Sequence, residues 1–126
     1  MIIAIEDASE TPIYQQIRNQ IVLGISDGRL SYGEQLPTVR GLAEEIGINC
    51  MTVNKAYQLL KQEGYIVTDR RNGARVRSDF AESRRLPAEA EETLRRIISE
   101  AKIAGMTKED FCTVCGKYFE KGGLDV

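Results

Sequence analysis

The sequence contains no histidine, only three cysteines and no long apolar run, and each shortage narrows what the protein can do. Histidine is the most frequent general acid–base residue, and the chain also lacks a nucleophile motif and a phosphate-binding loop. We therefore expect neither enzymatic activity nor a bound cofactor.

The apolar residues form no run of about 18, the length that a membrane-spanning helix needs. The apolar start, residues 1–5, is too short for a secretory signal and is followed by Glu6 and Asp7. An odd number of cysteines without an export signal argues against a disulfide scaffold and for reduced thiols. These features predict a cytoplasmic protein that does not bind membranes.

The formal net charge of −2 conceals a contrast along the chain. Residues 1–37 carry two basic and five acidic side chains, a net charge of −3. Residues 38–77 carry seven basic and four acidic side chains, a net charge of +3, whereas residues 78–126 have a net charge of −2. The basic excess therefore coincides with the segment whose pattern predicts a nucleic-acid contact, although charge alone is a weak indication.

Residues 36–65 have the pattern of two short helices joined by a tight turn. Pro37 and Thr38 favour a helix start, because proline fixes φ and a threonine side chain caps free N–H groups. Apolar residues then recur at helical spacing until Gly47, and Asn49 is placed to cap a second helix. This is the pattern of a helix-turn-helix.

The second of these helices has two distinct faces. Its inward face is formed by Val53, Ala56, Tyr57, Leu59 and Leu60. Its open face carries Cys50, Met51, Thr52, Asn54, Lys55 and Gln58. Short polar side chains can hydrogen bond to base edges in the major groove, and a lysine can bind phosphate. The open face therefore predicts DNA recognition.

The flanking segments complete a winged helix. Thr11 is expected to be the N-cap of a first helix that ends at Gly28 and buries Ile13, Ile17, Ile21 and Ile25 on one face. After the helix-turn-helix, residues 65–68 and 74–77 have strand composition, and residues 70–73 contain the Asn-Gly pair of a hairpin turn. Three helices followed by a basic two-stranded ribbon are typical of this fold.

From about Pro12 to Val76 the chain resembles the DNA-binding domain of the GntR family of bacterial transcriptional regulators. The short length and the string from Asn49 to Tyr57 resemble the YtrA subfamily in particular. The resemblance is carried by Pro12, Ile13, Tyr14, Gln16, Ile17, Gly28, Leu30, Gly33, Leu36, Pro37, Thr38, Arg40, Leu42, Ala43, Thr52, Val53, Ala56, Tyr57, Leu60, Gly64 and Tyr65.

The resemblance implies a set of DNA contacts. Thr38 and Arg40 would bind phosphate near a helix N-terminus, where free N–H groups also favour an anion. Contacts to bases or backbone would come from Asn49, Met51, Thr52, Asn54 and Lys55, and contacts by the wing from Arg71, Gly73 and Arg75. Arg71 and Arg75 stand where relatives usually have a glycine and an aromatic residue, which strengthens the basic character of this wing. The alternative for Arg40 is a surface ion pair with Glu44.

Residues 88–126 predict two further helices after a charged linker, residues 78–87. An apolar stripe at Ala90, Leu94, Ile97, Ala101 and Ala104 precedes Gly105. Thr107 and Asp110 have the spacing of a capping box for a second helix. Two helices this short cannot bury their own apolar faces, so we expect a homodimer formed through Leu94, Ile97, Ala101, Phe111, Val114 and Tyr118.

The sequence as a whole predicts a mostly α protein with a small β-wing. Residues 1–77 would form a winged helix-turn-helix DNA-binding domain, and residues 88–126 the dimerisation region. The expected function is repression of transcription by a homodimer on double-stranded operator DNA with inverted-repeat symmetry. A small-molecule effector is a further candidate partner. The alternatives are a protein-interaction module and a regulator switched by zinc or oxidation at Cys112 and Cys115.

Overall fold

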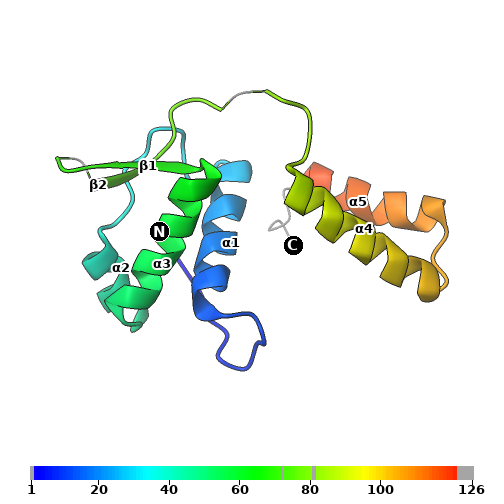
Figure 1. Cartoon of the computed structure of the whole chain (residues 1–126), viewed down its shortest axis with the longest axis horizontal. Helices are drawn as coiled ribbons and strands as arrows, with labels where there is room; N and C mark the ends of the chain where they lie inside the picture. The colour runs from blue at the N-terminus through cyan, green and yellow to red at the C-terminus, as the bar shows by residue number, and fades with distance from the viewer. Residues whose placement is uncertain (1, 72, 81, 122–126) are drawn as a thin grey trace. The chain divides into compact units, whose positions relative to one another are not determined.

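The computed structural model describes residues 2–71, 73–80 and 82–121. The chain divides into two compact units, Met1–Phe80 and Ala81–Val126, which we describe separately. The first contains α1 (Ile13–Ser26), α2 (Val39–Ile46), α3 (Cys50–Glu63), β1 (Ile66–Asp69) and β2 (Gly73–Val76), and the second contains α4 (Ala88–Ile103) and α5 (Lys108–Lys121) (Figure 1). The predicted winged helix is confirmed.

The helix-turn-helix is fixed by side-chain caps and two left-handed glycines. Thr38 Oγ1 accepts a hydrogen bond from the Gly41 N–H at 2.9 Å, and Asn49 Oδ1 accepts one from the Thr52 N–H at 2.9 Å. Gly47 ends α2 at φ 72° and a second glycine ends α3 at φ 88°, a region that residues with a Cβ rarely adopt. Both predicted caps and the predicted end of the first of these helices at Gly47 are confirmed.

The start of α1 differs from the expectation. Pro12, rather than Thr11, is the N-cap, and no side chain caps this helix. The Thr11 N–H donates to Ser9 Oγ at 3.1 Å, and its carbonyl accepts from Gln16 Nε2 at 2.9 Å. Because these bonds engage its backbone with the preceding turn, Thr11 lies outside the helix, which begins immediately after Pro12.

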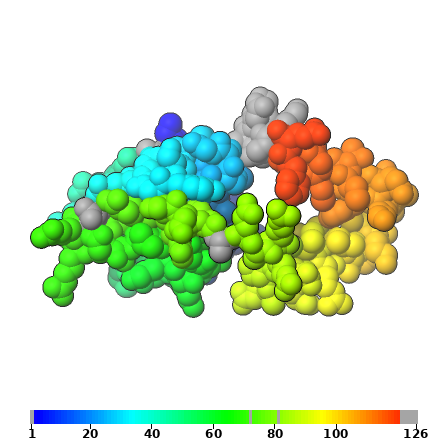
Figure 2. All heavy atoms as spheres, turned by 90° about the horizontal axis from the view of Figure 1, so that it is seen from above, coloured from blue at the N-terminus to red at the C-terminus, as the bar shows by residue number. Residues whose placement is uncertain are grey.

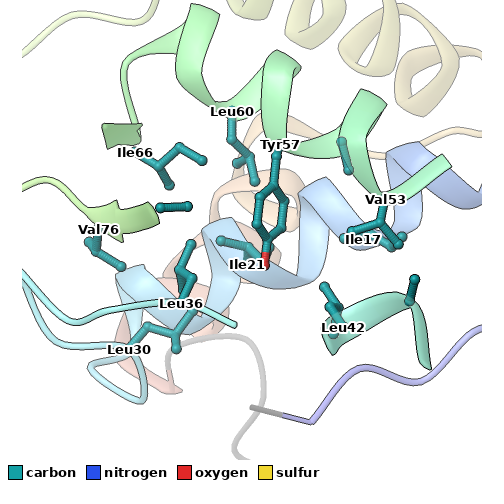
Figure 3. Packing of buried hydrophobic residues seen from close by; sticks show 13 residues of the cluster. Ile17, Ile21, Leu30, Leu36, Leu42, Val53, Tyr57, Leu60, Ile66 and Val76 are labelled. Carbon is teal, nitrogen blue, oxygen red and sulfur yellow. The ribbon is translucent and has the colours of Figure 1, made fainter. Parts of the chain in front are cut away.

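The core of the first unit lies where α1, α2, α3 and the ribbon meet (Figure 3). In Figure 1, α1 and α3 lie side by side, with α2 near the start of α3 and the ribbon after its end. The buried residues are Ile17, Ile21, Leu30, Leu36, Leu42, Ala43, Val53, Ala56, Tyr57, Leu60, Ile66, Ala74 and Val76. Ile13 and Ile25 pack against this cluster and are half-buried, so the expected apolar face of α1 is confirmed.

The wing is a two-stranded antiparallel ribbon whose register runs from Ile66 opposite Val76 to Asp69 opposite Gly73. The first strand begins one residue later than expected and the second begins one residue earlier. The side chains of β2 alternate between two faces, so Ala74 and Val76 are buried while the half-buried Arg75 lies on the other face. Asn72, expected in the turn, lies outside the described residues.

A third segment, which the sequence pattern does not predict, pairs with the ribbon. The Leu36 N–H donates to the Ala74 carbonyl at 2.8 Å, and the Val76 N–H donates to the Glu34 carbonyl at 2.9 Å. Gln35 forms an isolated bridge with Arg75. The chain that enters α2 is thus hydrogen bonded to the free edge of β2, which joins the wing to the helix-turn-helix.

In the second unit, α4 and α5 are joined through the expected capping box. The Asp110 N–H donates to Thr107 Oγ1 at 3.1 Å, and the Thr107 N–H donates to Asp110 Oδ2 at 3.0 Å. The hydrogen bond from the Thr107 backbone N–H to the carboxylate, with a smaller effect from the Thr107 side chain, lowers the pKa of Asp110. None of the side chains described in this unit is buried.

No described helix combines the length and the apolar character needed to cross a bilayer.

Candidate nucleic-acid interface

The start of α2 presents free backbone donors. Within the described residues, the N–H groups of Thr38, Val39 and Arg40 have no hydrogen-bond acceptor. Thr38 and Arg40 are exposed, and Val39 is half-buried. Unpaired N–H groups at a helix N-terminus carry partial positive charge, so this end of α2 favours an anion such as a phosphate.

The Arg40 side chain adds a full positive charge beside these donors. It is exposed, and it makes no ion pair with Glu44 or with any other carboxylate in the described part of the chain. The surface ion pair considered as an alternative for Arg40 is therefore not formed. The guanidinium remains available for a partner outside the chain.

The first turn of α3 presents side chains that differ in exposure. Met51 is 83% exposed and Asn54 is exposed, whereas Thr52 is half-buried. Asn49 uses Oδ1 for the cap, which leaves its Nδ2 group to donate to a ligand. Cys50, the first residue of α3, is also exposed. These residues form a mixed polar and apolar surface at the start of α3, next to α2.

Lys55 is held by an aromatic ring. Its Nζ atom lies 4.1 Å from the centre of the Tyr14 ring of α1, within the range of a cation–π interaction. The side chain is otherwise exposed. The structure therefore places the Lys55 charge against α1, a position that helical spacing alone did not indicate.

The wing carries cations on its turn and on its outer face. Arg70 and Arg71 are exposed at the turn, and Gly73 has a left-handed φ of 67°. Arg75 is half-buried, and its Nε atom is buried without a hydrogen-bond partner in the described residues. In the space-filling view the green segment that includes α3 and the ribbon forms one edge of the first unit (Figure 2). Arg70 is not among the contacts predicted from the sequence, although its place in a basic hairpin turn is a signal that points to it.

Two contacts behind this surface hold α3 in position. Arg18 Nε donates to Glu63 Oε1 at 2.8 Å, and this hydrogen bond is the main reason that the pKa of Arg18 is raised. The Tyr57 hydroxyl donates to the Pro37 carbonyl at 2.8 Å. Burial, with a smaller effect from Glu45, raises the pKa of Tyr57 above its ordinary value.

The expected dimerisation residues in the second unit fall into two groups. Leu94, Ala101 and Phe111 are half-buried, while Ile97, Val114 and Tyr118 are between 43% and 55% exposed. Cys112 is exposed and Cys115 is half-buried, and both are free thiols. Over the described ranges, no three side chains of the types that bind metals lie close enough to hold an ion.

A hollow of about 450 Å³ lies within this unit. Its lining is Ile98, Ala101, Lys102, Met106, Thr107, Lys108, Phe111 and Cys112. The wall is mainly apolar, and the two lysines add positive charge. Such a site suits a small apolar molecule that carries a negative group.

A family model described as "Bacterial regulatory proteins, gntR family" matches residues 12–76. These are the residues that form the three helices and the ribbon of the first unit. The chain is also similar to the HTH-type transcriptional repressor YtrA of Bacillus subtilis, with 37% identity over 110 residues, 85% of this chain and 84% of that protein. This similarity therefore includes most of the second unit.

Solved structures agree with the sequence comparison. YtrA from Sulfolobus acidocaldarius, a GntR-family transcription factor, is 40% identical and has a TM-score of 0.65, over 82% of this chain and 99% of that one. The DNA-binding domain of AraR in complex with operator ORX1 is 25% identical, with a TM-score of 0.52, over 58% of this chain and 90% of that one. The match to the Sulfolobus YtrA structure extends over both units. The AraR structure is that of an operator complex.

Proposed function

The chain belongs to the GntR family of bacterial regulatory proteins, and we propose that it represses transcription by binding an inverted-repeat operator as a homodimer. It is a transcriptional regulator of the YtrA-like kind and carries the family's DNA-binding domain. In the proposed division, residues 1–77 bind DNA, residues 78–87 form a linker and residues 88–126 dimerise. A relative that is 37% identical and is named a repressor supports repression.

The observation that carries this proposal is the placement of the exposed first turn of α3 beside free anion-binding groups. Arg40 and the uncapped N–H groups of α2 lie just before it in the helix-turn-helix, and the exposed arginines of the wing turn follow it in the chain. A helix flanked by phosphate-binding groups suits entry into the major groove. The related AraR domain, whose structure is that of an operator complex, supports the same role here.

The residues have distinct roles in the proposed complex. Thr38 and Arg40 bind a phosphate, while Asn49, Met51, Thr52, Asn54 and Lys55 contact bases or the adjoining backbone. Arg71, Gly73 and Arg75 of the wing contact the DNA backbone or the minor groove. We add Arg70 to this group because it is exposed at the turn beside Arg71.

The dimer is proposed from the second unit. Ile97, Val114 and Tyr118 expose apolar surface, and α4 and α5 contain no buried residue in their described parts, so the pair lacks a core of its own. We propose that the same helices of a second copy cover these side chains, while Leu94, Ala101 and Phe111 pack deeper in the assembly. A two-fold dimer would present two reading helices to two half-sites of opposite orientation.

Control by a small-molecule effector is part of the proposal. The hollow lined by Phe111, Met106 and Lys108 is the site in the second unit where a small apolar anion would bind. A screen of such compounds that measures release of operator DNA tests this point.

Selection of bound sites from random DNA tests the function. We expect an inverted repeat, and log affinity that falls linearly with log salt. Arg40→Ala should weaken binding to all sequences and reduce the salt slope by about one, whereas Asn54→Ala should relax preference at one position of each half-site. Lys61→Ala, which removes an exposed cation far along α3, is the matched control and should change neither. Failure of the folded wild type to enrich any sequence would disprove the proposal.

A further inference from the structure

Tyr57 is a core residue whose hydroxyl makes a hydrogen bond in addition to the apolar packing of its ring. The side chain extends from α3 into the cluster of apolar residues and is only 3% exposed (Figure 3). The ring fills the core as a phenylalanine would, but the hydroxyl donates to the Pro37 carbonyl at 2.8 Å. Since a buried hydroxyl needs a partner, the position of this partner fixes two segments relative to each other.

The Pro37 carbonyl lies just outside the hydrogen-bond ladder of α2. The first acceptor in that ladder is the Thr38 carbonyl, which accepts from the Leu42 N–H at 2.9 Å. The Pro37 carbonyl, one residue earlier, accepts from the Tyr57 hydroxyl instead. The Tyr57 hydroxyl thus helps to fix the direction of the Pro37–Thr38 peptide unit, which leads into the N-cap of α2.

That peptide unit also contains the Thr38 N–H. A trans peptide is planar, and its C=O and N–H bonds point in opposite directions. Because the Pro37 carbonyl points to the buried Tyr57, the Thr38 N–H points away from the core, on the exposed side of the chain. It is the first of the unpaired N–H groups at the start of α2, and it lies two residues before the unpaired Arg40 side chain.

We propose that the Tyr57 hydroxyl is a positioning group for DNA binding, which aims the N–H groups at the start of α2 and Arg40 at a single phosphate. This inference rests on the proposed function and assigns Tyr57, which does not touch DNA, a role in affinity. Tyr57 thereby links the helix that reads bases to the helix start that binds the backbone. One internal hydrogen bond thus connects the two contacts.

The test compares Tyr57→Phe, Arg40→Ala and the double variant in the full-length protein, on the operator found by selection. Fluorescence anisotropy at several salt concentrations gives affinity and salt slope, and urea unfolding gives stability. Tyr57→Phe keeps the ring, so we expect a folded protein with affinity reduced about fivefold to tenfold and a salt slope smaller by up to one. In the Arg40→Ala background the same change should have little further effect, because the phosphate contact is already lost.

Ile17→Val is the control for a purely structural effect, because it alters a fully buried core residue of α1 whose apolar side chain cannot hydrogen bond to the Pro37 carbonyl. It should lower stability and leave affinity and salt slope unchanged. The positioning role is overturned if Tyr57→Phe binds like the wild type, if Ile17→Val loses as much affinity, or if the losses from Tyr57→Phe and Arg40→Ala add. If the wild type itself selects no operator, the proposed function fails and the inference fails with it.

Discussion

Arg18 of α1 binds Glu63, the last residue of α3, through two hydrogen bonds, from Nε to Oε1 at 2.8 Å and from Nη2 to Oε2 at 3.1 Å. The guanidinium carbon also lies 5.6 Å from the centre of the Tyr65 ring. Paired hydrogen bonds of this kind give an arginine–carboxylate contact a fixed geometry as well as energy. The contact therefore fixes the end of α3 against α1, at the opposite end of the helix from its exposed first turn.

Replacing Glu63 with alanine should lower the free energy of unfolding by about 1 kcal/mol, because both partners are partly exposed and solvent limits the gain from the pair. Arg18→Ala should cost a similar amount, and the double variant little more than either single one. Urea unfolding followed by circular dichroism measures these values. Glu44→Ala, which removes an exposed carboxylate that has no ion pair in the described chain, is the control and should be neutral. Additive losses from Arg18→Ala and Glu63→Ala would show that the pair contributes nothing.

Alkaline pH should unfold the protein partly through Tyr57. Burial raises the pKa of this phenol above its ordinary value of 10.0, so the folded state favours the neutral form. The contribution of the neutral Tyr57 phenol to stability is complete below about pH 10 and is lost as the pH rises further. Above that pH Tyr57 loses its proton more readily in the unfolded chain than in the folded one, which favours unfolding. For this one group the loss is about 1.4 kcal/mol per pH unit.

Urea unfolding between pH 8 and pH 11.5 measures this dependence. Tyr57→Phe removes the group and should show a shallower decline above pH 10, although its stability at pH 8 is lower. The other tyrosines and the lysines are present in both proteins, so the difference between the two curves isolates Tyr57. Parallel curves would contradict the prediction.

Features fixed by a few neighbouring residues could be predicted from the sequence. Thr38 and Asn49 cap the helices that follow them because their short side chains reach an N–H three residues ahead. Gly47 ends α2 because a left-handed residue is needed there. The prediction for Thr11 was wrong, because Ser9 and Gln16, on either side of it, engage its backbone in the turn before the helix.

Contacts between distant residues could not be predicted in the same way. Tyr57 and Pro37 are 20 residues apart, and Arg18 and Glu63 are 45 apart, so only the packed fold brings them together. The pairing of residues 34–36 with β2 likewise carries no local signal. For the candidate site, the sequence predicts which residue types lie on the open face of α3. The position of the Lys55 charge over Tyr14 could not be predicted, because it depends on how α1 packs on α3.

Gly47 is the residue of the turn whose replacement should be most informative. Its φ of 72° strains any residue with a Cβ, although an added Cβ would meet no atom within 4 Å. Gly47→Ala should therefore lower the free energy of unfolding by about 1 kcal/mol through backbone strain alone. Gly47→Asn should recover part of this, because asparagine tolerates the left-handed region.

Thermal or urea unfolding of both variants checks the prediction. Gly116→Ala is the control, because Gly116 lies within α5, has no positive φ and also has open space around its Cβ position. Alanine there should be neutral or stabilising, since it has the higher helix propensity. If Gly47→Ala is as stable as Gly116→Ala, the turn does not depend on the left-handed conformation.

The proposed dimer should depend on Val114, which is 43% exposed on α5 in the single chain. Val114→Asp would place an unpaired carboxylate in the interface, and the two-fold axis repeats the change in both copies. We expect a monomer at micromolar concentration and a loss of operator affinity, because two half-sites are then no longer bound by one molecule. Sedimentation equilibrium measures the mass, and anisotropy measures binding to a whole operator and to a single half-site.

Thr113→Asp is the matched control, since it adds the same charge at the neighbouring exposed position of α5. It should leave both the mass and the operator affinity of the wild type unchanged. The monomer formed by Val114→Asp should bind a single half-site as weakly as the wild type binds it, because its reading helix is intact. A dimer that persists in Val114→Asp would show that another surface joins the two copies, while a monomer in both variants would mean that added charge, rather than the lost apolar contact, separates them.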